Sequence, residues 1–303
     1  MPISLLRGMS VMELLKKSIQ DFIDDDLSTH ASALAFQIIF SIFPFIIFLV
    51  ALLAFLDLSH FFSWIRNELA VFVPEASMGQ LNQVLDELQQ PREGLLSIGA
   101  LVALWSASAA MRSIMHAMNI AFDVTEERPA WKLFPLSLLY TIGLAILLII
   151  GVALLTVGPQ AMQWIADQIG LGQVFVTVWT WIRWPVAFLA LNLTIALIYY
   201  VAPNVKQRFR FITPGALLAV AIWIISSIGF NFYASNFANY NATYGSLGAI
   251  IILLFYFFLS SAILLFGAEV NAVVQEYAGE IKRPNKRNPS ANSSADSPRS
   301  NAR

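Results

Sequence analysis

The chain has 303 residues, of which 58% are hydrophobic and 12% charged, and its mean hydropathy is +0.68. These values lie outside the range of soluble domains and indicate a polytopic membrane protein. A formal net charge of −1 gives no long-range attraction for nucleic acid, and the absence of cysteine excludes disulfides, thiol nucleophiles and thiolate metal sites.

The first 32 residues are predicted to form a cytoplasmic amphipathic segment. Between residues 10 and 26, apolar side chains recur near the helical period at Val11, Leu14, Leu15, Ile19, Phe22 and Ile23. A helix with one such face lies in the membrane–water interface. A cleavable signal peptide is not expected, because acids and bases interrupt the first 30 residues and leave no compact apolar region.

Six long apolar runs follow, at residues 33–55, 94–110, 133–158, 182–202, 211–233 and 247–270. Each is close to the roughly 20 apolar residues that a helix needs to cross the hydrocarbon core. The predicted fold is therefore all-α, a polytopic six-transmembrane-helix bundle over residues 33–277. Pro44 lies inside the first run and predicts a helix kink, because proline removes a backbone donor.

The largest hydrophilic connection is the predicted outer loop at residues 57–93. Two amphipathic stretches flank Pro74 there, which indicates a helical hairpin on the periplasmic side. The same hairpin is a candidate surface for an envelope protein partner. The last segment, residues 278–303, is rich in Asn, Ser, Pro, Lys and Arg, a composition typical of a disordered cytoplasmic tail.

Basic residues mark one side of the predicted bundle. Fifteen of the 18 Lys and Arg residues lie in the N-terminal segment, in the connections after the second and fourth spans, and in the tail. Because Lys and Arg accumulate on the cytoplasmic side, both termini are predicted to face the cytoplasm. Lys206, Arg208 and Arg210 are candidates for contact with anionic lipid headgroups. The alternative is that they only fix the topology.

Polar residues form a stripe near the end of the second span. Trp105, Ser108, Arg112, His116, Asn119 and Asp123 recur at three- and four-residue spacing, which puts them on one helical face. An arginine at membrane depth needs a partner, water or a phosphate. Arg112 is therefore a candidate ligand for a lipid phosphate or another anion. Alternatively, it snorkels to the surface or joins two spans through a carboxylate.

Glu269 and Asn271 lie at the predicted cytoplasmic end of the sixth span. An ionisable residue there is a functional candidate, and Glu269 could relay a proton, pair with Arg112 or cap the inner end of the bundle. The candidate polar cavity, or anion and lipid headgroup site, consists of Ser108, Arg112, His116, Asn119, Glu269 and Asn271.

No catalytic or metal site is predicted. The chain has three histidines, and the predicted topology puts His60 on the opposite side from His30 and His116. The sequence contains neither a nucleophile-elbow motif nor a phosphate-binding loop. We therefore expect no enzymatic activity, cofactor, metal or nucleic-acid partner. Membrane lipids are the expected ligands, because the chain spans the bilayer.

Six different short motifs lie along the spans and their connections. They are Ala33-Leu34-Ala35-Phe36 with Ser41-Ile42-Phe43-Pro44, Trp105-Ser106-Ala107-Ser108 with Arg112 and Asn119, Tyr200-Val201-Ala202-Pro203-Asn204, Pro214-Gly215-Ala216, Tyr244-Gly245-Ser246-Leu247-Gly248-Ala249 and Gly267-Ala268-Glu269-Val270-Asn271-Ala272. Together they resemble the YihY/BrkB family of bacterial inner-membrane proteins, also called UPF0761 and formerly labelled ribonuclease BN, with Phe36 in place of the usual tyrosine. The resemblance implies a six-span inner-membrane protein with both termini in the cytoplasm, and it implies no settled activity.

Three functions are considered on these grounds. The first is transport, or the handling of lipids or anions, and it depends on Pro44, Arg112 and Glu269. The second is a non-transporting scaffold or envelope-assembly partner that binds through the outer loop. The third, a membrane-bound ribonuclease, has the least support, because the sequence offers no metal constellation and no extensive basic surface for nucleic acid.

The predicted pairing of Arg112 with Glu269 can be tested by a charge swap. If the two side chains pair, Arg112→Glu and Glu269→Arg should each lower the thermal unfolding midpoint, and the double variant should recover part of the loss. The measurement is a double-mutant cycle on the purified protein. A double variant whose loss equals the sum of the two single losses would exclude the pairing.

Overall fold

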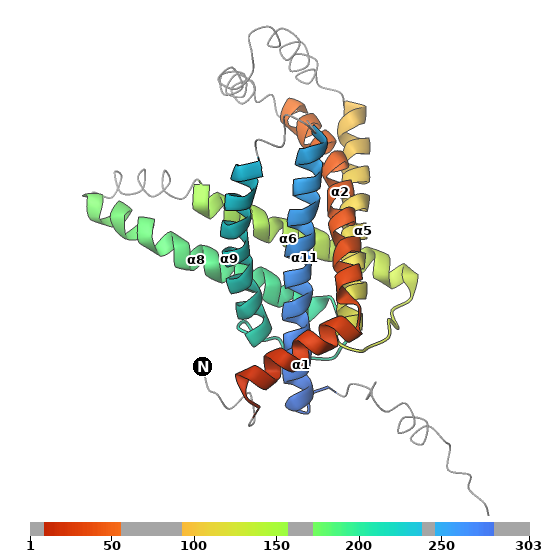
Figure 1. Cartoon of the computed structure of the whole chain (residues 1–303). Coiled ribbons are helices and arrows are strands. Elements are labelled where there is room, and N and C mark those ends of the chain that lie inside the picture. Colours follow the sequence, from red (N-terminus) through yellow and green to blue (C-terminus); the bar gives the residue numbers. More distant parts are fainter. Residues whose placement is uncertain (1–8, 56–92, 157–171, 238–245, 282–303) are drawn as a thin grey trace, which may run out of the picture.

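The computed structural model describes residues 9–55, 93–156, 172–237 and 246–281, and these residues form helices with no strand among them (Figure 1). The helices are α1 (Val11–Asp24), α2 (Leu27–Phe55), α5 (Glu93–Ala121), α6 (Ala130–Thr156), α8 (Gly172–Val201), α9 (Pro214–Phe237) and α11 (Ser246–Tyr277). The last six are long and apolar enough to cross a membrane, which confirms the six predicted spans. Residues 56–92 and 282–303, which hold nearly all of the predicted outer hairpin and tail, lie outside the described residues.

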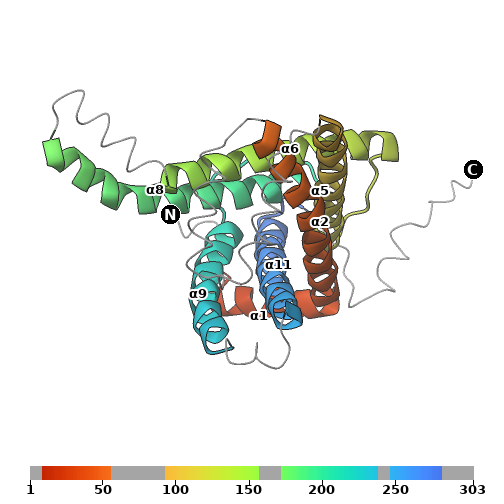
Figure 2. The ribbon, with the colours of Figure 1, turned by 90° about the horizontal axis from the view of Figure 1, so that it is seen from above.

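The long helices form two layers. In one layer α9, α11, α2 and α5 run alongside one another in that order, with α11 packed against both α9 and α2. In the other layer α6 and α8 lie together and cross one face of the first layer steeply (Figure 2). Only 6% of the residues in the apolar stretch of α6 (Ala130–Leu148) are buried inside the protein. Most of the surface of α6 therefore faces the surrounding membrane.

A hydrogen bond from Ser41 joins α2 to α5. The Ser41 hydroxyl donates to the carbonyl oxygens of Gln37 (2.7 Å) and Ser106 (3.1 Å), so its polar group is satisfied within the two spans. Helix α2 continues past Pro44, and its upper, orange part leans away from the lower part in Figure 1. A kink caused by Pro44 itself stays a prediction.

Helix α1 lies across one end of the bundle (Figure 1). It begins with a capping box, in which the Ser10 hydroxyl accepts from the Glu13 N–H while the Glu13 carboxylate accepts from the Ser10 N–H. Leu14 is buried, and Lys17 forms an ion pair of 2.6 Å with Glu276 of α11. Half or more of the surface of Val11, Met12, Ile19 and Ile23 is exposed. The helix thus packs with one part of its apolar face and leaves the other part exposed, while its position in the membrane interface stays a prediction.

The described connections gather at the same end as α1. The α1–α2 turn, the α5–α6 connection, the α8–α9 loop and the end of α11 all lie there (Figure 1), and hydrogen bonds join them. Arg128, Lys132, Lys206, Arg208 and Arg210 lie in or beside these connections. These five basic residues, which the sequence groups on one side, therefore lie at one end of the molecule. Which side of the membrane this end faces stays a prediction.

Helices α9 and α11 approach closely near Gly215 and Gly267. The Gly215 N–H donates to Asn271 Oδ1 (2.9 Å), and the Asn271 Nδ2 group donates to the Thr213 hydroxyl (3.0 Å). A Cβ atom added to Gly215 would meet the Gly267 carbonyl oxygen and would lie 2.7 Å from Asn271 Cγ. Because the first of these atoms belongs to the backbone, it cannot move aside without shifting a helix.

Gly215→Ala should therefore lower the thermal unfolding midpoint, by an overpacking cost of about 1–3 kcal/mol in the free energy of unfolding. Gly229→Ala, in the same helix, is the matched control, since a Cβ added there meets nothing within 4 Å. The control should unfold at the wild-type midpoint or slightly above it. Equal midpoints for the two variants would contradict the close contact.

Candidate functional site

The candidate site is built on the α8–α9 loop, residues 202–213. Helix α8 ends at Val201 because Pro203 follows and cannot continue it. Helix α9 begins at Pro214, which suits the first helical position, and the preceding Thr213 hydroxyl accepts from the Ala216 N–H (3.2 Å). The loop therefore has a defined start and end, and its basic residues occupy the short distance between them.

Hydrogen bonds to α5, to the α5–α6 connection and to α8 hold this loop in place. Asn119, near the end of α5, accepts from the Asn204 N–H (2.7 Å), and the Asn204 amide donates to the Thr125 carbonyl oxygen (3.1 Å). The Gln207 amide donates to the Tyr199 carbonyl oxygen (2.6 Å) at the end of α8. The loop is thus attached to the end of α5 and to the end of α8. Asn119 has a positioning role in this arrangement.

Helix α5 ends in a turn that suits this fastening. Asp123 adopts a left-handed conformation (φ 54°), the Val124 N–H donates to the Asn119 carbonyl oxygen (2.9 Å), and the Asp123 N–H donates to the Ile120 carbonyl oxygen (3.0 Å). These two bonds form a Schellman motif, which stops the helix. The chain then turns toward the loop instead of extending α5 past it.

Arg128 and Glu126 form a fork beside the loop. Arg128 Nε and Nη2 donate to Glu126 Oε1 (2.7 Å) and Oε2 (2.6 Å), and Arg128 Nη2 also donates to the Ala202 carbonyl oxygen (3.0 Å). Mainly through the side-chain hydrogen bonds from Arg128, with a smaller contribution from Asn119, the pKa of Glu126 is held below its usual value. Arg128 is therefore committed to holding the loop.

An open cavity of about 720 Å³, here called the basic groove, lies between this loop, the α5–α6 connection and the ends of α6 and α8. Its charged lining residues are Glu127, Arg128, Lys206 and Arg208, and its uncharged lining includes Leu136, Tyr140, Tyr200, Val201, Pro203 and Asn204. Lys206, Arg208 and Glu127 are exposed, and no ion pair joins them to another described residue. The groove thus presents two cations and one carboxylate, none of them in an ion pair with a described residue, beside an aromatic and apolar wall.

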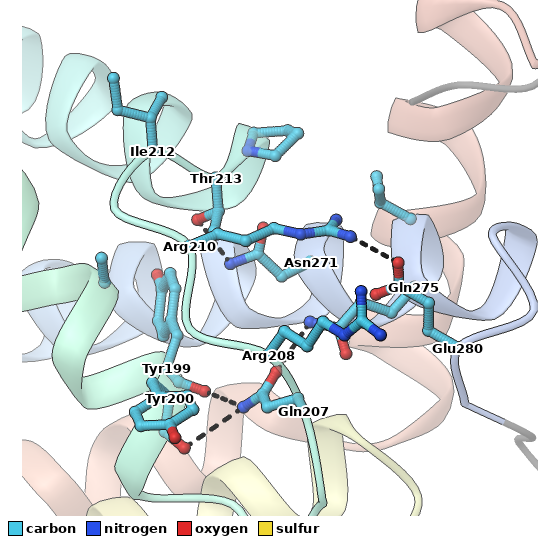
Figure 3. Close-up of a pocket in the computed structure, with 13 residues that line it drawn as sticks. Tyr199, Tyr200, Gln207, Arg208, Arg210, Ile212, Thr213, Asn271, Gln275 and Glu280 are labelled. Carbon is cyan, nitrogen blue, oxygen red and sulfur yellow. Dashed lines mark hydrogen bonds and ion pairs between the residues drawn. The ribbon is translucent and has the colours of Figure 1, made fainter. Parts of the chain in front are cut away.

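A second, smaller pocket lies on the other side of the loop (Figure 3). Its volume, about 30 Å³, suits roughly one water molecule. Arg210 forms an ion pair of 2.5 Å with Glu280, and the Gln275 amide donates to Gln207 Oε1 (2.8 Å). Asn271 bonds to Thr213 in the same view. Arg208 lines this pocket as well as the basic groove, and Gln275 Oε1 is buried without a hydrogen-bond partner among the described residues. The bonds of Arg210, Gln207 and Asn271 in this pocket hold the loop against α11 and the residues that follow it.

Two of the residues predicted from the polar stripe lie where α5 meets α6. Arg112 Nη1 donates to the hydroxyls of Ser108 (2.9 Å) and Ser137 (3.2 Å). Its guanidinium carbon lies 4.3 Å from the centre of the Phe134 ring. These contacts direct Arg112 toward α6, and its pairing with Glu269 would require different side-chain positions. That pairing stays a prediction.

The other predicted residues are spread over separate places. His116 is exposed, with its ring centre 5.5 Å from that of His30 on α2. Glu269 is fully buried, while Asn271 contacts the start of α9. Positions two apart on a helix point to nearly opposite faces, so these two residues do not face a common space. Among the described residues, the predicted site residues that line the basic groove are Lys206 and Arg208.

The sequence did not identify Glu127 or Tyr140 as part of the site. The groove joins segments around residues 127, 140 and 206, which are far apart in sequence. No spacing rule connects such segments. Asn204 did carry a signal, since it ends the motif Tyr200-Val201-Ala202-Pro203-Asn204.

Fold and site together define a class: an integral membrane protein with six long apolar helices, whose described polar connections gather at one end of the bundle. The chain belongs to the family described as virulence factor BrkB, whose family model matches residues 18–292. The family and the six apolar helices agree with a multi-pass membrane protein.

Individual relatives support this membership. The chain is 35% identical over 266 residues to a Bacillus subtilis protein named as ribonuclease-like, YfkH, covering 88% of this chain and 96% of that protein. It is 30% identical to a UPF0761 membrane protein of Xanthomonas campestris, over 84% of this chain and 59% of the relative. It is also 30% identical to a UPF0761 membrane protein of Chromohalobacter salexigens, over 90% of this chain and 65% of the relative. No solved structure matches the chain.

The Arg128–Glu126 fork predicts an acid-sensitive step. A carboxylate with a lowered pKa in the folded state contributes stability that is complete above its ordinary pKa, about 4.3, and is lost as the pH falls through the lower folded value. Thermal unfolding midpoints measured from neutral pH downward should therefore fall in acid, and Glu126→Gln should flatten this dependence. Glu127→Gln is the control, because Glu127 pairs with no described residue, and it should keep the wild-type profile. Identical profiles for both variants would contradict the role of the fork.

Proposed function

We propose that this protein handles lipids by binding phosphate-bearing headgroups in the basic groove. The observation that carries the proposal is the pair Lys206 and Arg208, both exposed and free of ion pairs to described residues, at the edge of a cavity of about 720 Å³. Two neighbouring cations differ from this pair. Arg128 and Arg210 each form an ion pair with a carboxylate, and these ion pairs stabilise the loop.

The two cations offer complementary chemistry for a phosphate. Arginine presents a planar fork that matches two phosphate oxygens, and lysine adds a compact charge with three donors. A basic residue near an anionic membrane surface contributes about 1 kcal/mol of attraction. Because both side chains are exposed, this attraction should weaken as the salt concentration rises.

The residues that alternate with the cations suit a membrane surface. Phe209, Phe211 and Ile212 are each 40–44% exposed. Phe209 makes an edge-to-face contact with Tyr200, with ring centres 5.3 Å apart. Large exposed aromatic side chains are anchors at headgroup depth. The loop thus combines exposed apolar side chains with cations in one short segment.

The positive-inside rule supports a cytoplasmic position for this end of the molecule, in a bacterial inner membrane. The groove would then receive lipids of the inner leaflet. Transport is a second candidate function, and the observation that favours it is Glu269, a fully buried carboxylate within the α11 span. Ionisable residues inside spans mark ion or substrate pathways in many membrane proteins.

The groove proposal predicts that Lys206→Ala with Arg208→Ala lowers phospholipid binding by on the order of tenfold, since two surface attractions are lost. The measurement is native mass spectrometry of the purified full chain mixed with phosphatidylglycerol. The matched control is Lys16→Ala with Lys132→Ala, which removes the same charge from exposed positions outside the groove. Equal retention in the two double variants would overturn the proposal.

A further inference from the structure

The basic groove also contains a carboxylate, Glu127. It lies in the α5–α6 connection, is exposed, and lines the same cavity as Lys206 and Arg208. Its neighbours in sequence, Glu126 and Arg128, pair with each other at 2.6 Å. Glu127 has no such pair with a described residue, so its charge is available to the groove.

Opposite charges that serve structure are paired elsewhere at this end of the molecule. Arg128 with Glu126, Arg210 with Glu280 and Lys17 with Glu276 all lie within 2.5–2.6 Å. The groove differs, because Lys206, Arg208 and Glu127 line one cavity and form no ion pair with a described residue. The cavity therefore has a positive part from the α8–α9 loop and a negative part from the α5–α6 connection.

Hydrogen bonds fix these two connections relative to each other. Asn204 donates to the Asn119 side chain and to the Thr125 carbonyl oxygen, and Arg128 donates to the Ala202 carbonyl oxygen. Each of these bonds joins a side chain of one segment to the backbone of another, and together they tie the α8–α9 loop to the end of α5 and to the α5–α6 connection. The spacing between the positive and negative parts is thereby set by the folded chain.

We propose that the groove takes a zwitterionic headgroup that carries a phosphate and a primary ammonium, the headgroup of a phosphatidylethanolamine lipid. The phosphate would bind Lys206 and Arg208, and the ammonium would donate to Glu127. This inference rests on the proposed function. A glycerol headgroup would leave Glu127 without a cation, and a choline headgroup has no N–H to donate.

The wall of the groove points to a lipid as the source of this headgroup. Leu136 and Tyr140 come from the α6 span, and Tyr200 and Val201 come from the α8 span. Charged lining residues at one part of the cavity therefore continue into apolar and aromatic ones that reach membrane-spanning helices. A volume of about 720 Å³ also leaves room for the start of acyl chains beside a headgroup.

The test is a competition among three lipids. The full chain is mixed with equal amounts of phosphatidylethanolamine, phosphatidylglycerol and phosphatidylcholine, and retained lipid is counted by native mass spectrometry. The wild type should retain phosphatidylethanolamine several-fold over the other two. Glu127→Gln should abolish this preference while phosphatidylglycerol retention stays the same or rises. Asp24→Asn, which removes an exposed carboxylate of α1 outside the groove, should keep the preference.

The possible failures can be told apart. A wild type that retains none of the three lipids would overturn the proposed function itself. Equal retention of phosphatidylethanolamine and phosphatidylglycerol, unchanged by Glu127→Gln, would overturn the zwitterionic headgroup and leave lipid binding in place. A further arm adds free phosphoethanolamine: displacement of the lipid at a similar concentration would overturn the contribution of the acyl chains. Unfolding midpoints of Glu127→Gln and Asp24→Asn verify that both variants are folded.

Discussion

Hydrocarbon offers no hydrogen bonds to a polypeptide, so every backbone polar group within the membrane must find its partner inside the protein. This constraint makes the six long apolar runs helical and moves irregular backbone to the ends of the bundle. It also explains why Ser41, Ser108 and Ser137 direct their hydroxyls to carbonyl oxygens of their own or neighbouring helices. The connections that the structure describes meet at one end of the bundle, and there their polar groups can bond to water as well as to protein.

Two kinds of charged residue share that end. One kind is paired and holds elements together: the Arg128–Glu126 fork fastens the α8–α9 loop, and the Lys17–Glu276 pair joins α1 to α11. The other kind, Lys206, Arg208 and Glu127, lines a cavity and has no ion pair with a described residue. The two kinds differ in their partners in the folded chain, although the sequence shows the same residue types for both.

The sequence predicts features that depend on neighbouring residues, and it does not predict features that join residues far apart in the chain. Span number and the gathering of Lys206, Arg208 and Arg210 followed from run length and charge placement, which are local properties. The capping box at Ser10 and Glu13 was also readable, since it needs only four residues. The groove was not, because Glu127, Tyr140 and Lys206 meet only after α5, α6 and α8 have packed. Arg112 makes the same point: its partner Ser137 lies on another helix.

The steep second layer has a consequence for what counts as the complete molecule. With 6% of the residues in its apolar stretch (Ala130–Leu148) buried, α6 leaves most of its surface outside the protein. Acyl chains must fill the remaining surface, and in doing so they become part of the packing that holds α6 and α8 against the first layer. Membrane thickness and lipid shape are then structural variables of the fold, comparable to a core substitution in a soluble domain.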